Sequence, residues 1–528
     1  MKQILRASLL FISGFFIQTL QINANNISVS GISITGKNTT AGVNNAANYS
    51  LVKFNIAWEN SWRSSALNWD AAWVFVKYRV NGGAWNHCNL NNTGHTAPTG
   101  STIDAGLVAP SSTFNATTNP AVGVFIYKNA DGNGNVNYQN VQLRWNYGSQ
   151  GVADNAVLDV KVFAIEMVYV PTGTFAVGDG KDESIEYQAA PRFSLTTINT
   201  GNATTAPSGI GSLGGQAGGY PTGQTAPTSS SWPNGYNAFY SMKYELTVGQ
   251  YRDFLNTLTY TQQTSKCSLD IVTVGNFVNP YMPDTWRNKL KVKTAGVVST
   301  VPAIFGCDLN DNGVYDESSD GEFIAIANIN WADFGSFLDW SGLRPITEME
   351  FEKACRGNQT PVSGEYAWGT SSIFVAEHDL SNSGYTNEAI SSNYSTTLNQ
   401  GNAAYAYGVG PLRVGIFASN SNNLGRVTSG SSFYGIMELS GNAGELAINL
   451  YLSSGRSFTG DHGNGILQSD GLFNVSNWPS SNSGIGSRGG YFTDYQQLLE
   501  VSNRSYIDSN VGSSRNGGFV GRGVRSAQ

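Results

Sequence analysis

Oxygen-bearing side chains at alternate positions form the first candidate site in this sequence. Asp308, Asn310 and Asn312 occupy every second position, and a glycine follows. Carboxylate and amide oxygens at this spacing are typical of the first three ligands of a calcium-binding loop. The acid that such a loop has at its twelfth position is replaced by Ser319. An Asx-rich turn without metal is the alternative, because such turns are frequent in chains rich in Asn and Gly.

Histidine and cysteine positions predict neither a zinc site nor a catalytic dyad. No two histidines are close enough to suggest a zinc pair, and no two cysteines form a CxxC motif. The histidines are His87, His95, His378 and His462, and the cysteines are Cys88, Cys267, Cys307 and Cys355. For an exported protein we expect either a disulfide between Cys267 and Cys307, which lie at the two ends of one segment of the chain, or free buried thiols.

The composition indicates a loop-rich globular protein with β-structure. Hydrophobic residues make up 40% of the chain and aromatic residues 12%, which argues against disorder. Only 13% of the residues are charged, whereas 61 of the 528 are glycine. The net charge of -7 and the lack of a basic run argue against nucleic-acid binding. A chain of this length is expected to form two or more domains.

The first 24 residues have the pattern of a signal peptide. Lys2 and Arg6 give a positive start, and the apolar stretch 7–20 that follows is short for a membrane span. Ala24 stands at the expected cleavage position, and an uncleaved anchor is the alternative. We find no other segment apolar enough to cross a bilayer. We therefore expect a secreted protein, in the periplasm, at the cell surface or outside the cell, with no integral span after signal removal.

Residues 25–165 are expected to form an all-β, sandwich-like domain. Runs rich in β-branched and aromatic residues occur at 73–80, 122–127, 141–145 and 157–164. Glycine and asparagine turns separate these runs, and no helical segment of useful length lies among them. Several short strands at such spacing are typical of a β-sandwich.

Residues 166–528 are expected to form a second, loop-rich domain of α+β class. Thr247 and Thr347 are each followed three residues later by Gln or Glu, which is the capping-box signature of a helix start. Between them, residues 331–340 repeat apolar side chains at helical spacing. The remainder is rich in Gly, Asn and Ser, which predicts long irregular loops.

Seven segments of this second domain occur in a characteristic order. They are MVYVPTGTFAVG, KYELTVGQYRDFL, NWADFGSFLDWSGLRPITEMEFEKACRG, YAWG, YGIMELSGNAGE, GSRGGYF and GFVGRGVRS. In this order they resemble the formylglycine-generating enzyme family, also called the sulfatase-modifying-factor domain family. The resemblance covers about residues 166–526 and implies a distorted, C-type-lectin-like α+β fold. The expected sandwich-like domain lies outside it.

The resemblance also shows a departure from the family's chemistry. Members bind copper through two cysteines after the RGG motif and oxidise a cysteine of a client sulfatase to formylglycine. In this chain those positions correspond to Asp494 and Leu499, and no cysteine occurs between Arg488 and Gln528. Because copper in such a site needs thiolate ligands, we expect no copper and no oxidase activity.

The family's calcium site is better preserved in this sequence. By position, the resemblance implies a side-chain ligand at Glu438, backbone carbonyls at Gly441 and Ala443, and a carboxylate at Glu445. This mixture of oxygen ligands suits a hard cation, so we expect calcium as a structural cofactor. A turn with two solvated glutamates is the alternative.

The segment after the RGG motif lines a broad loop-built face in the family. Aromatic and small polar side chains in it are typical of an adaptable recognition surface. The candidate ligand-binding residues are Tyr491, Phe492, Asp494, Tyr495, Asn503, Arg504 and Tyr506. We expect a secreted binding or surface-assembly protein whose partner is a glycan or a surface protein. The alternative is a formylglycine-generating or related oxidase with an altered metal site.

Overall fold

The structure is a computed structural model that carries side chains. It describes residues 26–181, 192–193, 195–203, 226–280, 286–375, 377–406, 408, 410–420, 422–423, 425–507, 511–515 and 517–527. The expected signal peptide, residues 1–24, lies outside these residues. Across the described part of the chain, no helix combines the length and the apolar character that a membrane span requires.

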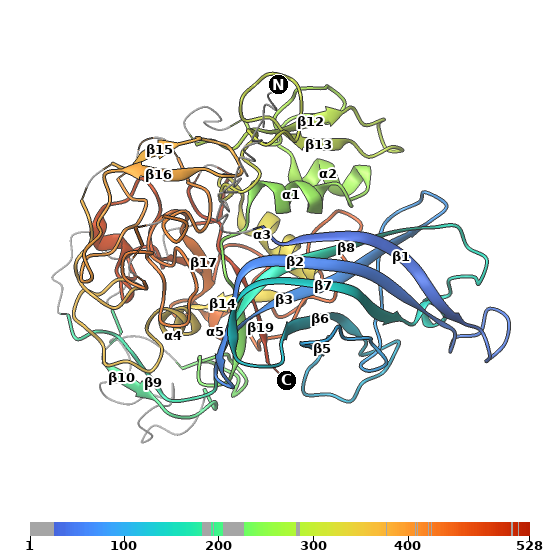
Figure 1. The fold of residues 1–528 in the computed structure, drawn as a ribbon, viewed down its shortest axis with the longest axis horizontal. Helices are drawn as coiled ribbons and strands as arrows, with labels where there is room; N and C mark the ends of the chain where they lie inside the picture. Colours follow the sequence, from blue (N-terminus) through green and yellow to red (C-terminus); the bar gives the residue numbers. More distant parts are fainter. Residues whose placement is uncertain are drawn as a thin grey trace, which may run out of the picture.

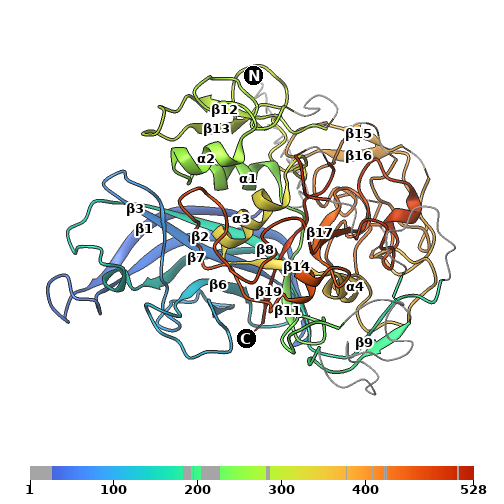
Figure 2. The same ribbon diagram turned by 180° about the vertical axis from the view of Figure 1, so that it is seen from behind.

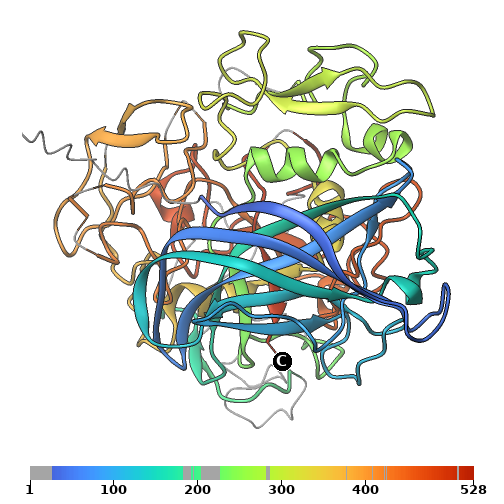
Figure 3. The same cartoon turned by 45° about the vertical axis from the view of Figure 1, so that its right-hand side comes forward.

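The N-terminal part of the chain forms two layers of antiparallel strands (Figure 3). One layer contains β1 (Ser28–Asn38), β2 (Tyr49–Ser65) and β7 (Gly132–Trp145). The other contains β3 (Asn68–Val80), β4 (Asn86–His87), β5 (Ser101–Leu107), β6 (Ala121–Lys128) and β8 (Leu158–Val170). Alternate side chains of the layers meet in one apolar core. The four strand-like runs predicted from the sequence all lie in these strands, apart from the first residue of the run at 157–164.

Strand β3 is buried on both faces, which explains its nearly continuous apolar sequence. Its side chains alternate between two cores. Ala72, Val74 and Val76 lie in the core between the N-terminal layers. Trp73 and Phe75 lie in the larger core shared with the C-terminal part. The strand therefore belongs to both parts of the molecule.

Strand β8 continues the sheet from the N-terminal strands into the C-terminal part. It pairs with β3 along most of its length, and its last four residues pair with β11 (Phe239–Met242). The sheet then runs through β19 (Gly523–Ser526), β14 (Arg344–Thr347), β17 (Glu445–Ile448) and β18 (Ile485–Arg488). Figures 1 and 2 show these strands between the N-terminal layers and the loop-rich remainder. The expected boundary between residues 165 and 166 falls inside β8.

Polar contacts fix the junction at the end of helix α3 (Trp331–Ser341). The buried amine of Lys77 donates to the carbonyl of Trp340 at 2.8 Å, and the indole N–H of Trp73 donates to the carbonyl of Ser341 at 2.8 Å. Burial lowers the pKa of Lys77, and both donors satisfy carbonyls at the helix C-terminus, which have no intrahelical partner. The N-terminal strands therefore cap a helix of the C-terminal part.

The C-terminal part contains short helices set among loops. The helices are α1 (Val248–Leu255), α2 (Tyr260–Lys266), α3, α4 (Glu348–Arg356) and α5 (Ser453–Arg456). Capping boxes at Thr247 and Thr347 are confirmed, and two more begin α2 and α3. Helices α1 and α2, with the hairpin of β12 (Leu290–Thr294) and β13 (Ile304–Cys307), lie on the side of α3 that faces away from the large sheet (Figure 2). A loop-rich α+β architecture is thus confirmed.

The remaining regular elements are short. They are β9 (Phe175–Val177), β10 (Thr196–Ile198), β12 (Leu290–Thr294), β13 (Ile304–Cys307), β15 (Asp379–Ser381), β16 (Ala389–Ser392) and the 3₁₀ helices η1 (Tyr147–Gln150) and η2 (Gln496–Leu499). Each two-stranded pair, β9–β10, β12–β13 and β15–β16, stands apart from the large sheet. These pieces leave long stretches of backbone that side chains must hold in place.

The expected Cys267–Cys307 disulfide does not form. All four cysteines are free and buried. Cys267 ends helix α2, whereas Cys307 lies in β13 with its sulfur 3.9 Å from an Arg252 nitrogen. Burial raises the pKa of the Cys267 thiol to about 12, so the thiol stays protonated at neutral pH. The alternative of free buried thiols is the one observed.

Candidate functional site

The RGG motif turns the chain sharply at the end of β18. Gly489 and Gly490 both have positive φ, at 81° and 63°. A Cβ on Gly489 would lie 2.6 Å from the carbonyl oxygen of Leu439, and a Cβ on Gly490 would lie 2.7 Å from a Leu499 methyl carbon. Only glycine satisfies both the conformation and the close packing. The motif thereby directs the next segment across the end of the sheet.

Asp494 is the first of the two positions at which the family resemblance implies a copper ligand. Its carboxylate accepts hydrogen bonds from the Tyr491 amide at 3.0 Å and from the Tyr506 hydroxyl at 2.9 Å. The side chain is largely buried, and burial raises the pKa of Asp494 to about 7, although both hydrogen bonds oppose the shift. The carboxylate of Asp494 therefore stabilises the turn through these two hydrogen bonds and gains or loses its proton near neutral pH.

Leu499 is the second such position and is fully buried. It packs with Tyr366 and Trp368 in a small apolar cluster, and its carbonyl accepts a hydrogen bond from Ser440. A hydrogen-bonded carboxylate and an apolar side chain do not match the soft donors that a copper–thiolate site needs. The residues present therefore do not fit the family's copper ion.

The structure divides the candidate ligand-binding residues into two groups. Tyr491 and Tyr506 are half-buried, and Tyr495 is 76% exposed. Phe519, which the sequence did not single out, packs edge-on against both Tyr491 and Tyr506, at centroid distances of 5.0 and 5.5 Å. The rings of Tyr491, Tyr506 and Phe519, the carboxyl of Asp494 and the exposed Tyr495 that follows it are called the aromatic group after the RGG motif.

The other candidates lie beneath this group. Phe492 is fully buried with its ring centroid 5.4 Å from that of Trp286. Asn503 is buried and donates to the carbonyl of Gln497 at 3.0 Å. Arg504 is fully buried in ion pairs. These three side chains hold the loop and are not presented to solvent.

A buried ion network supports the loop through helix α4. The carboxylate of Glu348 contacts the guanidinium of Arg504 at 2.8 Å and that of Arg488 at 3.1 Å. One turn later, Glu352 contacts Arg488 at 2.8 Å and Arg356 at 3.2 Å. All five side chains are at most 1% exposed. Burial acts to raise the pKa of Glu352, but the neighbouring arginines lower it overall.

Glu500 anchors the same loop on its other side. It forms ion pairs with Lys181 at 2.9 Å and with Arg192, which also pairs with Asp179 at 2.9 Å. Glu500, Arg192 and Asp179 are buried. The segment that follows β9 is therefore tied to the loop after the RGG motif.

The residues of the expected calcium site lie at the start of β17. Glu438 and Glu445 are both buried, and one oxygen of each carboxylate has no hydrogen-bond partner. The other oxygen of Glu438 accepts from the Gly415 amide at 2.9 Å, and that of Glu445 pairs with Arg522 at 2.6 Å. Among described residues, no grouping of three or more His, Cys, Asp or Glu side chains is suited to a metal ion.

A third buried glutamate, Glu245, adjoins this segment and was not predicted from the sequence. It accepts hydrogen bonds from the Ala443 amide at 2.7 Å and from the Asn442 side chain at 2.6 Å. Burial raises the pKa of Glu245 and of Glu445, and it raises the pKa of Glu438 to about 7. Three carboxyls thus lie near the buried guanidinium of Arg522, and the buried guanidinium of Arg413 also lowers the pKa of Glu438 against the effect of burial.

The loop at Asp308 is organised around a lysine. The ammonium of Lys291 lies 2.8 Å from Asp308 and also contacts Asp311. The side-chain oxygens of Asn310 and Asn312 accept backbone N–H groups of the loop itself. The side chains expected to bind calcium are therefore occupied by an internal cation and by Asx turns.

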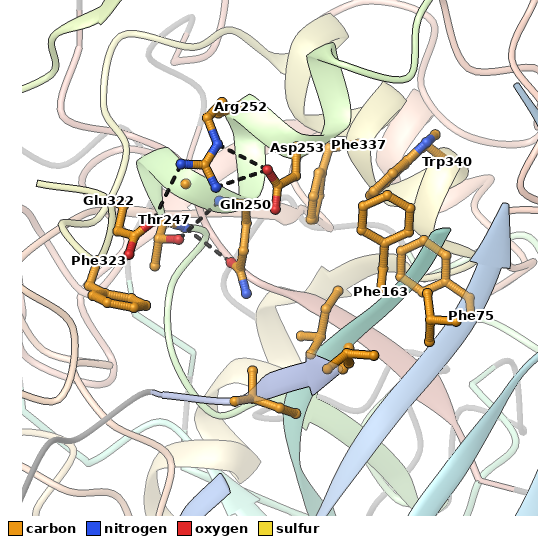
Figure 4. Close-up of a pocket in the computed structure, with 16 residues that line it drawn as sticks. Phe75, Phe163, Thr247, Gln250, Arg252, Asp253, Glu322, Phe323, Phe337 and Trp340 are labelled. Atoms are coloured by element: carbon orange, nitrogen blue, oxygen red, sulfur yellow. Dashed lines mark hydrogen bonds and ion pairs between the residues drawn. The ribbon is translucent and has the colours of Figure 1, made fainter. Parts of the chain in front are cut away.

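A cavity of about 340 Å³ lies between helix α1 and the strands β1 and β8 (Figure 4). One wall is aromatic and includes Phe163, Phe337 and Trp340. The polar groups of the opposite wall bind one another: Arg252 pairs with Asp253 and with Glu322, at 2.9 and 3.3 Å. Since these polar groups are already satisfied, the cavity offers few free contacts to a ligand.

Comparison with known families identifies most of the chain. The family model described as sulfatase-modifying factor enzyme 1-like domain matches residues 158–525. The match begins at the first residue of β8 and ends inside β19. No curated protein matches the sequence.

The ion network makes a testable prediction about stability. Glu348→Gln keeps the shape of the side chain but leaves Arg488 and Arg504 buried without this carboxylate. Because an uncompensated buried charge is costly, we expect a loss of about 3–5 kcal/mol in the free energy of unfolding, measured by denaturant titration. Asp159→Asn removes an exposed partner of Arg79 and should cost about 1 kcal/mol or less. Equal effects of the two substitutions would contradict the role of the network.

Asp494 makes a second prediction, about pH. Its pKa is higher in the folded chain than in the unfolded chain, so the folded state retains a proton that the unfolded state releases. The contribution of Asp494 to stability is therefore full below about pH 4 and is lost as pH rises to about 7. Relative to Asp494→Asn, the native protein should lose about 1–4 kcal/mol over this range. Tyr495→Phe, at an exposed position, should leave the pH profile of unfolding unchanged; parallel profiles for the native protein and Asp494→Asn would refute the assignment.

Proposed function

The chain belongs to the sulfatase-modifying factor enzyme 1-like family, and we propose that it is a secreted binding or surface-assembly protein without the family's oxidase chemistry. One observation carries the proposal. The two positions that correspond to the family's copper ligands are occupied by Asp494 and Leu499. The carboxylate of Asp494 is hydrogen-bonded within the loop, and Leu499 is fully buried. No thiol is available in this segment, because the chain has no cysteine after Cys355.

The aromatic group after the RGG motif supports binding as the function of this face. Tyr491, Tyr495 and Tyr506 present their rings, with the Tyr506 hydroxyl held by Asp494, and tyrosine loses little rotamer freedom when it contacts a partner. Ion pairs of Arg504 and Glu500 hold the loop beneath, so the face is pre-organised. We infer that the partner is a glycan or a surface protein, and that the fold is the C-type-lectin-like arrangement of the family.

The N-terminal strands form the sandwich-like domain of this proposal. Their two layers enclose a core of their own, and the second layer packs on the C-terminal part through β3. Because Lys77 and Trp73 donate to the end of α3, we infer that the domain docks rigidly against the binding domain. A rigid junction suits a protein that joins a surface assembly.

We further propose calcium at the segment from Glu438 to Glu445. The two unpartnered carboxylate oxygens favour a bound cation, since an unmatched buried carboxylate is costly. Among the described residues, none donates a hydrogen bond to the carbonyls of Gly441 or Ala443. Carboxylates combined with free carbonyls are the donors that calcium prefers.

Two assays test the central proposal. Purified mature protein, supplied with copper and a cysteine-containing sulfatase peptide, should yield no formylglycine by mass spectrometry. On a glycan array and in pull-downs from the native envelope, Tyr495→Ala and Tyr506→Phe should weaken capture about tenfold. Tyr385→Ala, at an exposed tyrosine between β15 and β16, is the matched control and should have no effect. Formylglycine made by the protein would overturn the proposal in favour of an altered oxidase.

Calcium makes a separate prediction. Addition of about 1 mM calcium should raise the unfolding temperature of chelator-treated protein, because a ligand that binds only the folded state stabilises it. Glu438→Gln should remove most of this rise by replacing a carboxylate ligand. Asp308→Asn, in the loop held by Lys291, should retain the rise. A response that disappears in Asp308→Asn and persists in Glu438→Gln would place the ion elsewhere.

A further inference from the structure

A row of aromatic side chains crosses the strands at the junction of the two parts. Tyr169 in β8 lies directly opposite Tyr240 in β11, and Tyr240 lies opposite Arg525 in β19. The row extends to β3, where the indole of Trp69 stacks on Tyr169 with ring centroids 3.8 Å apart. Adjacent strands thus present one continuous stripe built from both parts of the molecule.

This row lines a cavity of about 480 Å³ that β5 and β6 close from the other side. From β6, Phe125 stacks on Tyr240 at 3.8 Å and Tyr127 lies 5.6 Å from Trp69. The volume falls within the range of about 300–1,000 Å³ usual for small-ligand sites. Because each ring is held by another ring, the walls are fixed before any ligand enters.

Polar groups are set among these rings. The carboxylate of Asp104 is exposed at the cavity and accepts a hydrogen bond from the Tyr127 hydroxyl. Burial alone raises the pKa of the Tyr169 hydroxyl, and the Tyr240 hydroxyl interacts with the Trp69 indole N–H, which can only donate, so within the described part of the chain both hydroxyl protons remain for a ligand. Asp104 thus supplies the hydrogen-bond acceptor of the cavity, and the hydroxyls of Tyr169 and Tyr240 supply its hydrogen-bond donors.

The cationic lining residue is already engaged. Both terminal nitrogens of Arg525 donate to backbone carbonyls, those of Gly342 and Leu107. Its guanidinium also lies over the Trp73 ring, 4.6 Å from the centroid. Among the lining residues, the charge that faces an incoming ligand is therefore the carboxylate of Asp104, which repels anions. The guanidinium of Arg63 lies beside the cavity over the rings of Trp69 and Tyr127, 5.1 and 5.7 Å from their centroids, and donates to the carbonyl of Lys128.

We propose that this junction cleft, lined by Trp69, Asp104, Tyr127, Tyr169 and Tyr240, binds a neutral saccharide. A saccharide combines apolar C–H faces, which pack on aromatic rings, with hydroxyls that donate to a carboxylate and accept from tyrosine. The carboxylate disfavours uronic and sulfated sugars, and the free donors and acceptor disfavour a purely apolar ligand. The cleft is built from residues other than those of the loop after the RGG motif.

The experiment uses the full mature chain and three defined probes. These are the hexasaccharides of β-1,4-linked glucose, β-1,4-linked N-acetylglucosamine and α-1,4-linked glucose, titrated by calorimetry up to about 10 mM. At least one probe should bind, and Asp104→Asn should weaken that binding about tenfold or more. Tyr169→Phe and Tyr240→Phe should each weaken it severalfold. These variants keep the rings, so their unfolding temperatures should match that of the native protein.

Controls separate this cleft from the binding face proposed above. Tyr495→Ala, in the loop after the RGG motif, should leave saccharide affinity unchanged. Failure of all three probes to bind, or binding that survives Asp104→Asn and Tyr169→Phe together, overturns the cleft proposal and leaves the loop face untouched. Formylglycine production would overturn the proposed function without bearing on saccharide affinity, so the two failures are distinguishable.

Discussion

Buried arginines are the interaction on which the C-terminal part of this protein depends. Short helices and strands leave many loop carbonyls without partners in regular secondary structure. Fully buried guanidiniums meet this need because each offers five donors in a planar array. Arg488 donates to the carbonyl of Val501 as well as to two glutamates, and Arg522 donates to the carbonyl of Lys243 as well as to Glu445. The glutamates neutralise charges that would otherwise be too costly to bury.

This arrangement explains how a face made of loops stays in place. Helix α4 has a capping box at its start, and its first two turns carry Glu348 and Glu352 inward. Two of the arginines that these residues bind, Arg488 and Arg504, come from β18 and from the loop after the RGG motif, and the third, Arg356, ends α4 itself. The position of Tyr491 and Tyr506 at the surface therefore depends on charges that lie beneath them. The proposed binding face and the stability of the domain rest on one set of contacts.

Clusters of acidic side chains are neutralised differently at two places in the chain. At Asp308 the ammonium of Lys291 lies between the acidic side chains of Asp308 and Asp311 and pairs with both. At Glu438 and Glu445 the buried guanidiniums of Arg522 and Arg413 act on the carboxylates, yet one oxygen of each of the two glutamates remains unpartnered. The contrast explains why similar acidic patterns lead to different proposals. At the junction, by comparison, the charges are few and the contacts are mainly aromatic.

Residue types and their spacing along the chain predict those elements whose signals are local. The alternation in 73–80, the capping boxes at Thr247 and Thr347, and the ordered motifs predicted strands, helix starts and the family. Absence of cysteine after Cys355 was also readable without a structure. Such features depend on neighbours along the chain, so residue type and spacing suffice to predict them.

Contacts between distant parts of the chain set which of those residues are available to a ligand. Arg504 and Phe492 looked like surface groups in the sequence, yet one pairs with Glu348 and the other packs on Trp286. Likewise, Lys291 supplies the cation at Asp308, and the Cys267–Cys307 disulfide is not made. Each outcome depends on contacts between residues remote in the chain. Burial and pairing of charge are set by those contacts, and no local pattern encodes them.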